Sequence, residues 1–228
     1  SVCNQCHLQG EARILRYGRS SFDFRPGDEL SDVWVAFVRG TNVGENQKTD
    51  AVSQVEQMMS SRCYIQSQGK FGCISCHDPH SRPKEADLVG FYRGRCLACH
   101  TQEQPACAVP VETRLVETSS DSCIHCHMPR LAATDVPHTS QTDHRVLRNP
   151  KRIDSDSNAE EPPVAVFDGA DKRVSELEIN RARGLMIMRY AEEHSDVYAV
   201  FRASELLKPV VEALDRKSTR LNSSHTSI

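Results

Sequence analysis

The chain has 228 residues, a formal net charge of −3 and a pI near 6.4, and its basic residues are scattered, so it lacks the footprint of a nucleic-acid-binding protein. Its hydrophobic content of 38% and aromatic content of 6% are low for a chain that must build its core from side chains alone. We therefore expect a group other than protein side chains to fill part of the interior. No apolar stretch approaches the length of a membrane span.

The N-terminal part of the chain is expected to contain a minor β element. The segments ARILRY (12–17) and DVWVAFV (32–38) are rich in β-branched and aromatic residues, which favours strands. A loop of sequence FRPGDELS joins them. Residues 50–62 are expected to form a short helix.

Four copies of the motif Cys-x-x-Cys-His dominate the sequence. The eight paired cysteines are Cys3, Cys6, Cys73, Cys76, Cys96, Cys99, Cys123 and Cys126, and the histidines that follow are His7, His77, His100 and His127. On a helical turn both thiols reach the two vinyl groups of one porphyrin, and the next histidine can bind its iron. The motif therefore predicts covalent haem c, four in this chain, each on a turn or two of helix. Pro79 and Pro129 are expected to end two of these helices.

The cysteine pairs are also compatible with a zinc site or with disulfide bonds. With nineteen residues between them, the pairs Cys73/Cys76 and Cys96/Cys99 fit a four-cysteine zinc ribbon. A disulfide framework is the second alternative in an oxidising compartment. Neither requires a histidine after every second cysteine, which favours haem.

Haem iron has two axial positions, and each motif fills one of them. We predict that three of the six other histidines are distal ligands: His80, His138 and His144. His80 follows its own motif too closely to cross its own haem, so it is expected to reach a neighbouring one. The alternative for each is a solvated surface histidine, which is what we expect of His194 in its charged segment.

Cys63 and Cys107 are the two cysteines outside the motifs. In an oxidising compartment two remaining thiols usually pair, so we hypothesise a Cys63–Cys107 disulfide. The alternative is two buried free thiols.

The C-terminal part is expected to be a separate helical segment. Residues 149–172 have the polar and proline-rich composition of a linker, and residues 173–214 carry apolar side chains at helical spacing. Pro209 is expected to kink the second helix or to begin a new one. Such a pair fits either the start of a tetratricopeptide array or an ordinary helical hairpin.

The last residues of the chain are expected to be an artefact. The tail from Asp215 to His225 resembles the translation of a common sequencing-library adapter. We expect residues 215–228 to pack against nothing and to bind nothing, so that His225 is no ligand.

The segments SRCYIQSQGKFGCISCHDPH, CLACHTQEQPAC, CIHCHMPR and VPHTSQTDHRVL resemble bacterial multihaem c-type cytochromes. These are related to the tetrahaem electron carrier of hydroxylamine oxidation, and some continue into tetratricopeptide repeats. The resemblance covers about residues 1–150, and implies closely packed, mostly bis-histidine haems in an extracytoplasmic protein with further motifs upstream. Many relatives have a histidine where this chain has Met58 and Met59, so one haem takes a methionine, takes a ligand from a preceding segment, or has an open site.

Together these features predict a mainly α protein with long loops and a minor β element, organised by haem packing. Residues 1–148 would form a multihaem domain that is incomplete at its N-terminus, in a periplasmic or cell-surface protein whose signal peptide lies upstream. The expected function is electron transfer with redox partner proteins rather than enzymatic catalysis, and the helical segment would offer a site for a protein partner. The alternative is a multihaem oxidoreductase acting on a small nitrogen or sulfur compound at one open haem, for which the His7 haem is the candidate.

Overall fold

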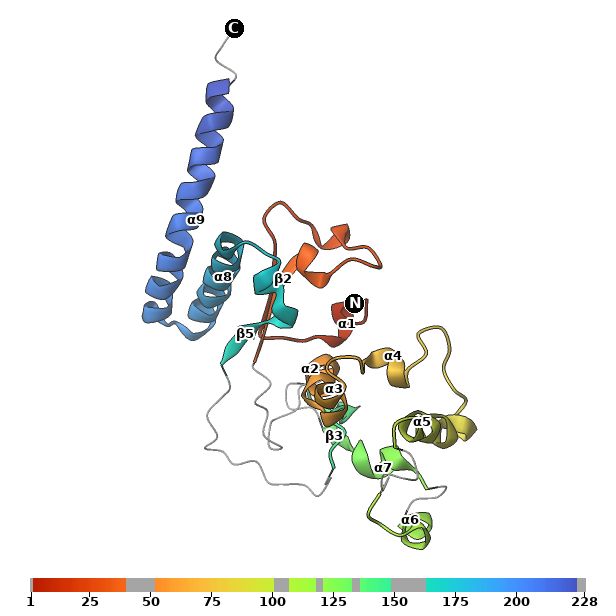
Figure 1. Ribbon diagram of the computed structural model, residues 1–228. Helices are drawn as coiled ribbons and strands as arrows, with labels where there is room; N and C mark the ends of the chain where they lie inside the picture. Colours follow the sequence, from red (N-terminus) through yellow and green to blue (C-terminus); the bar gives the residue numbers. More distant parts are fainter. Residues whose placement is uncertain are drawn as a thin grey trace. The chain divides into compact units, whose positions relative to one another are not determined.

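The structure, a computed structural model, describes residues 2–39, 52–100, 107–117, 121–132, 136–148 and 163–224 (Figure 1). It is mainly helical with two small sheets, which confirms the expected fold class. The chain divides into two compact units. The sheet unit comprises the described parts of residues 1–5, 10–39 and 163–228, and the motif unit comprises those of residues 6–9 and 40–162.

A three-stranded antiparallel sheet organises the sheet unit. β1 (Ala12–Leu15) and β2 (Trp34–Arg39) are the two strands expected from the sequence, and they pair with Ala12 opposite Phe37. The 3-10 helices η1 (Ser21–Asp23) and η2 (Leu30–Asp32) lie in the loop between them. The other edge of β2 pairs with β5 (Val164–Val166), which gives the strand order β1-β2-β5.

The expected linker 149–172 is only in part described, and its described part differs from a linker. Residues 149–162 lie outside the described ranges. After them, β5 is followed by the 3-10 helix η4 (Phe167–Lys172), whose Phe167 and Ala170 are buried. The reason is non-local pairing: the short apolar run VAV completes a sheet whose other strands lie more than a hundred residues earlier.

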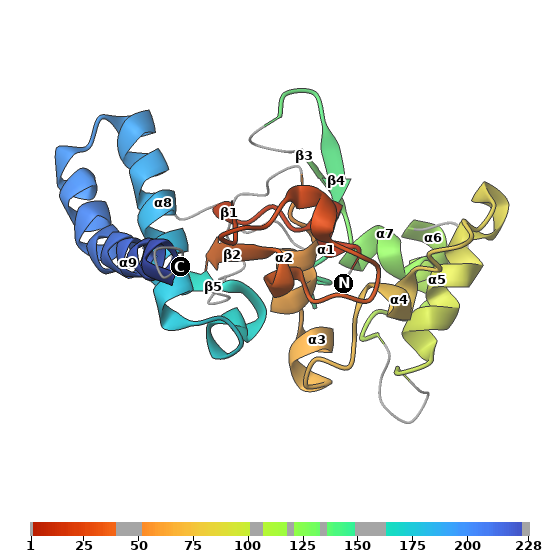
Figure 2. The same cartoon turned by 90° about the horizontal axis from the view of Figure 1, so that it is seen from above.

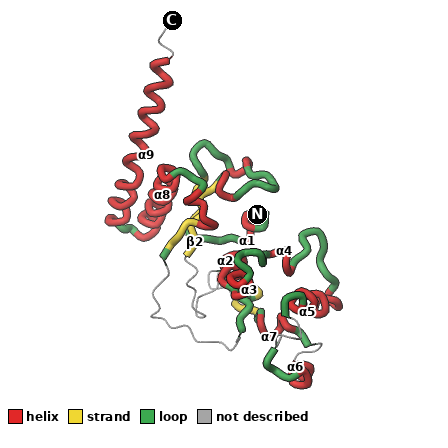
Figure 3. The backbone as a smooth tube through the Cα atoms, in the orientation of Figure 1, coloured by secondary structure: helices red, strands yellow, loops and turns green. Residues whose placement is uncertain are grey.

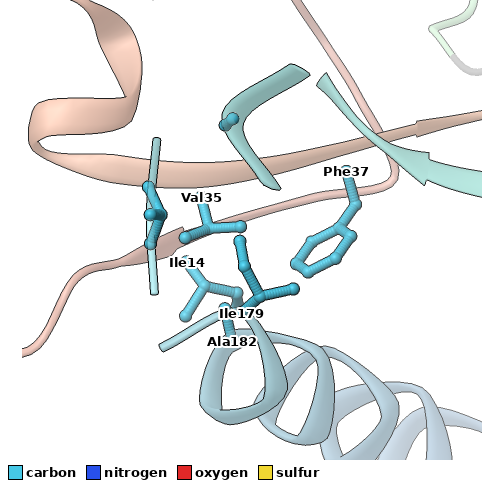
Figure 4. Close-up of a cluster of buried hydrophobic side chains, with 7 residues drawn as sticks. Ile14, Val35, Phe37, Ile179 and Ala182 are labelled. Atoms are coloured by element: carbon cyan, nitrogen blue, oxygen red, sulfur yellow. The ribbon is translucent and has the colours of Figure 1, made fainter. Parts of the chain in front are cut away.

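The core of the sheet unit lies between the sheet and helix α8 (Glu176–His194) (Figure 4). Ile14, Val35 and Phe37 from the strands meet Ile179 and Ala182 from the helix. The hydroxyl of Ser175 caps α8 by accepting from the Glu178 amide. The segment expected to be helical is thus a helix that packs on the β element.

Helix α9 (Val197–Ser224) packs along α8 as a helical pair (Figure 2). It runs through Pro209, which corrects the expectation of a new helix at that position. A proline inside a helix costs about 3 kcal/mol. Ala203 and Val210 are buried before and after it, so packing on both sides holds the helix together. His225 and the side chains after Arg216 lie outside the described residues, so the expectation for the tail stays a prediction.

Gly184 is the point of close approach between α8 and α9. A Cβ atom at Gly184 would lie 2.7 Å from Cγ of Leu207 and 3.3 Å from the Ala203 carbonyl oxygen. We expect Gly184→Leu to destabilise the chain by about 1–3 kcal/mol through overpacking, measured by thermal unfolding. Arg189→Leu, at an exposed position of the same helix, is the control. Equal unfolding curves for the two variants would contradict this packing.

The motif unit is made of short helices joined by loops (Figure 3). Its described elements are the end of α1 (Asn4–His7), α2 (Gln54–Ser60), α3 (Arg62–Gln66), α4 (Cys73–Cys76), η3 (Glu85–Asp87), α5 (Leu88–Leu97), α6 (Val111–Glu117), α7 (Cys123–His127), and the hairpin of β3 (Arg130–Ala132) with β4 (Ser140–Thr142). Ser61 caps α3 and Ser122 caps α7 through their hydroxyl groups.

The motif unit has a thin apolar core. Among its described residues, Leu8 and Val55 are the only buried hydrophobic side chains. The buried polar side chains outnumber them, and they are Gln57, Ser61, Gln141 and Asp143. Apolar burial is the main stabilising contribution to a fold, so side chains alone give this unit little stability.

Candidate haem-binding site

Each motif lies on a helix or at its end, as the spacing predicts. The His77 amide donates to the Cys73 carbonyl at 2.8 Å, and the His100 amide donates to the Cys96 carbonyl at 2.9 Å. These i+4 hydrogen bonds place each histidine one turn after the first cysteine of its motif. The third motif differs in detail, because α5 ends at Leu97 and Cys99 and His100 lie in the following turn.

Two of the motif histidines are oriented through Nδ1 by a carbonyl oxygen. Nδ1 of His127 lies 2.6 Å from the Leu147 carbonyl oxygen, and Nδ1 of His7 lies 3.3 Å from Oε1 of Gln54. A carbonyl only accepts, so in this contact Nδ1 carries the proton and Nε2 keeps its lone pair. That is the tautomer a histidine needs to bind a metal through Nε2.

The imidazole rings of His77 and His144 are neighbours with nearly parallel planes. Their ring centroids are 6.2 Å apart and their planes differ by 26°. Two imidazoles that share one metal ion, at about 2.1 Å from each nitrogen, have centroids roughly 6 Å apart. Among the predicted distal histidines, the structure thus brings His144 next to a motif histidine.

The position of His144 follows from the strand hairpin. After β4 the chain returns along the fourth motif, where the Asp143 amide donates to the Pro129 carbonyl at 2.9 Å. Nδ1 of His144 donates to the Thr142 carbonyl at 2.7 Å, and the His144 amide donates to Oε1 of Gln57 at 2.8 Å. His144 therefore has the same Nδ1 arrangement as His7 and His127.

The environment favours neutral imidazoles at this pair. Burial lowers the pKa of His144, more than the hydrogen bond to Thr142 raises it. Burial also lowers the pKa of His77, and the nearby charge of His7 lowers it further. Neutral imidazole is the form that binds a metal.

The thiols of the second, third and fourth motifs lie close together. The thiol of Cys96 and the sulfur of Cys123 form a hydrogen bond, which lowers the pKa of Cys123 to about 6 and raises that of Cys96. Burial raises the pKa of Cys76, and the neighbouring thiols of Cys63, Cys73 and Cys99 raise it further. Helices α5 and α7 pack together, and Arg93 of α5 pairs with Asp121 just before α7 at 2.7 Å.

The hypothesised Cys63–Cys107 disulfide is not formed in the structure, where both residues are free thiols. Cys63 instead lies within electrostatic range of the motif thiols Cys76 and Cys99. Burial is the main cause that raises its pKa. Helix α3 places Cys63 beside these thiols. The pairing with Cys107 was inferred only because two cysteines lie outside the motifs, and that count carries no information on where each one lies in the fold.

The other two predicted distal histidines are exposed. His80 follows a turn in which its amide donates to Asp78 Oδ1 at 2.9 Å and the Ser81 hydroxyl donates to Asp78 Oδ2 at 2.7 Å. His138 lies in the turn before β4 with a φ of 61°. His194, expected to be a surface residue, stacks on Tyr190 at 4.1 Å in α8.

Sequence reasoning missed four residues around these histidines. They are Gln54, Gln57, Gln141 and Tyr92, whose hydroxyl lies 3.5 Å from Nδ1 of His77. The signal available was weak: Gln54 and Gln57 stand three apart on a predicted helix, so they share a face. Nothing in the sequence pairs them with His7 or His144.

The sequence matches the family described as the doubled CXXCH motif over residues 67–105, which contain the second and third motifs. No curated protein and no solved structure matches the chain. The match supports a multihaem c-type cytochrome, in which the paired motifs bind haem covalently. It favours haem over the zinc and disulfide alternatives.

The residues present fit haem c on two structural grounds. The histidine tautomers and the His77–His144 spacing suit axial ligation, and the thin core of the motif unit suits a large apolar group. Proteins that carry haem c are typically extracytoplasmic. None of the helices in the described ranges is long and apolar enough to cross a membrane.

Proposed function

We propose that this chain carries electrons through closely packed c-type haems, one at each of the four motifs. The observation that carries the proposal is the convergence of motif residues within one unit. His7 and His77 interact electrostatically, His77 lies against His144, and the Cys96 thiol contacts Cys123. Haems attached at such neighbouring points would lie close enough to exchange electrons.

The residues that would hold the haems fall into three groups. The thioether bonds would come from the eight motif cysteines, and the proximal ligands would be His7, His77, His100 and His127. His144 would join His77 in holding the iron of the haem at Cys73 and Cys76. His80 and His138 would serve two of the other haems, each by reaching a neighbour from its exposed loop.

When bound, the haem iron supplies reversible one-electron oxidation and reduction. The chain determines what else can happen at the site. His77 and His144 would together hold one iron and so leave it no room for a substrate, and burial lowers the pKa of both imidazoles, which favours the neutral form that binds a metal. Redox partner proteins would therefore approach the haem edges, outside the cytoplasm.

The haem count tests this proposal. Denatured protein should retain a c-type pyridine haemochrome spectrum with four haems per chain, because thioether bonds survive unfolding. Replacing both cysteines of one motif by serine, as in Cys96→Ser with Cys99→Ser, should lower the count to three. Replacing the serine pair Ser20 and Ser21 by alanine is the control. Zinc instead of iron in elemental analysis would refute the proposal.

A further inference from the structure

Helix α2 places two glutamines beside histidines from two different parts of the chain. Oε1 of Gln54 lies 3.3 Å from Nδ1 of His7, and its Nε2 donates to Oε1 of Gln141 at 3.1 Å. One helical turn later, Gln57 accepts from the His144 amide at 2.8 Å and donates to the Ser53 hydroxyl at 2.8 Å. Both amide groups are therefore engaged at both ends.

The glutamines of this network differ in burial, because Gln54 is half-buried and its contact with His7 is exposed, whereas the other two are buried. Gln57 and Gln141 are 7% and 8% exposed. A buried amide that loses a partner costs about 1–3 kcal/mol, so the orientations of Gln57 and Gln141 are fixed by their neighbours. Gln141 in turn orients Gln54 by accepting from its Nε2. If the Gln54 amide were reversed, its NH₂ group would face Nδ1 of His7 and favour the tautomer with the proton on Nε2. That tautomer cannot bind iron, so the observed orientation is the one compatible with a ligand.

We propose that Gln54 is a positioning residue that fixes the tautomer and ring plane of His7 and lowers the reduction potential of its haem. This inference rests on the proposed function, in which His7 binds haem iron. Gln141 orients Gln54, and Gln57 secures the main chain of His144 from the same helix face. Helix α2 thus supports axial ligands of two haems although it contains no motif residue.

The direction of the effect follows from the hydrogen bond. An acceptor at Nδ1–H makes the imidazole a stronger base at Nε2, which stabilises ferric iron more than ferrous iron. A carboxylate is a stronger acceptor than an amide, because the bond is then charge-assisted. An alkyl side chain offers no acceptor at all.

Two nearly isosteric variants test the role. Gln54→Glu should lower the midpoint potential of one haem, and Gln54→Leu should raise it, in redox titrations followed by visible absorbance. The other midpoints should change less. Gln66→Leu, at an exposed position of α3, is the control and should leave all midpoints unchanged. Shifts in the same direction for both Gln54 variants, or no shift, would overturn the proposal. A purely structural role would not distinguish a stronger hydrogen-bond acceptor from a side chain with no acceptor.

The same samples separate this inference from the proposed function. Pyridine haemochrome assays report the haem count before each titration. Absence of covalent haem in the unchanged protein would refute the proposed function itself. Four haems with no opposed shifts would refute only the role of Gln54. If Gln54→Leu lost a haem, the Gln54→Glu variant would still decide: a lowered potential supports the role, and an unchanged one overturns it.

Discussion

Replacing His144 by alanine should convert one haem from low-spin to high-spin, about one in four of the ferric haems. The reason is the His77–His144 pair, whose ring centroids lie 6.2 Å apart. Without the His144 imidazole, His77 alone would hold this iron, and a haem with one strong ligand fewer would be high-spin. Ferric electron paramagnetic resonance, compared with the unchanged protein, measures the fraction.

Added imidazole should restore the low-spin signal of this variant, because it can occupy the open position. His194→Ala is the matched control, since His194 lies on α8 and stacks on Tyr190. A fully low-spin spectrum of His144→Ala would show that His144 is not a ligand. A high-spin fraction in the unchanged protein would instead support the oxidoreductase alternative, in which one haem is open.

Replacing Asp143 by alanine should destabilise the chain by about 3–5 kcal/mol, because the largely buried guanidinium of Arg145 loses the carboxylate that it pairs with. Asp143 is fully buried, and its carboxylate accepts from Arg145 in a bidentate pair: Nε lies 3.0 Å from Oδ1, and Nη2 lies 2.7 Å from Oδ2. This pair flanks His144 on both sides in the sequence. Thermal or denaturant unfolding measures the loss.

The double variant Asp143→Leu with Arg145→Met provides the comparison. Replacing both partners of a buried ion pair by apolar residues is often neutral, so most of the lost stability should return. A double variant as unstable as Asp143→Ala would mean that the pair stabilises the chain in some other way. Glu11→Ala breaks the exposed pair with Arg39 and should cost only about 0–1 kcal/mol.

Local features could be predicted from the sequence. The strands at Ala12–Leu15 and Trp34–Arg39 follow from runs of β-branched and aromatic residues, and the motif helices follow from the spacing of their cysteines. Both depend on residues within one short segment. Features that depend on distant packing were missed: β5 pairs with a strand far away in the chain, and α9 runs through Pro209 because α8 supports it.

The site shows the same division. The motif cysteines and histidines could be identified from the sequence, but which of His80, His138 and His144 lies beside a motif histidine depends on the fold. The β3–β4 hairpin brings His144 to His77, while the other two histidines are exposed. The partners of the supporting glutamines could not be predicted, because a hydrogen bond between Gln54 and Gln141 joins residues 87 positions apart.

The contrast between the two units bears on how the protein matures. The sheet unit has its own apolar cluster, whereas the described part of the motif unit buries two hydrophobic side chains. Attachment of haem would therefore supply much of the free energy that folds the motif unit, as metal binding does in small metalloproteins. In cells starved of iron we expect proteases to degrade this unit first and to leave a fragment that contains α8 and α9.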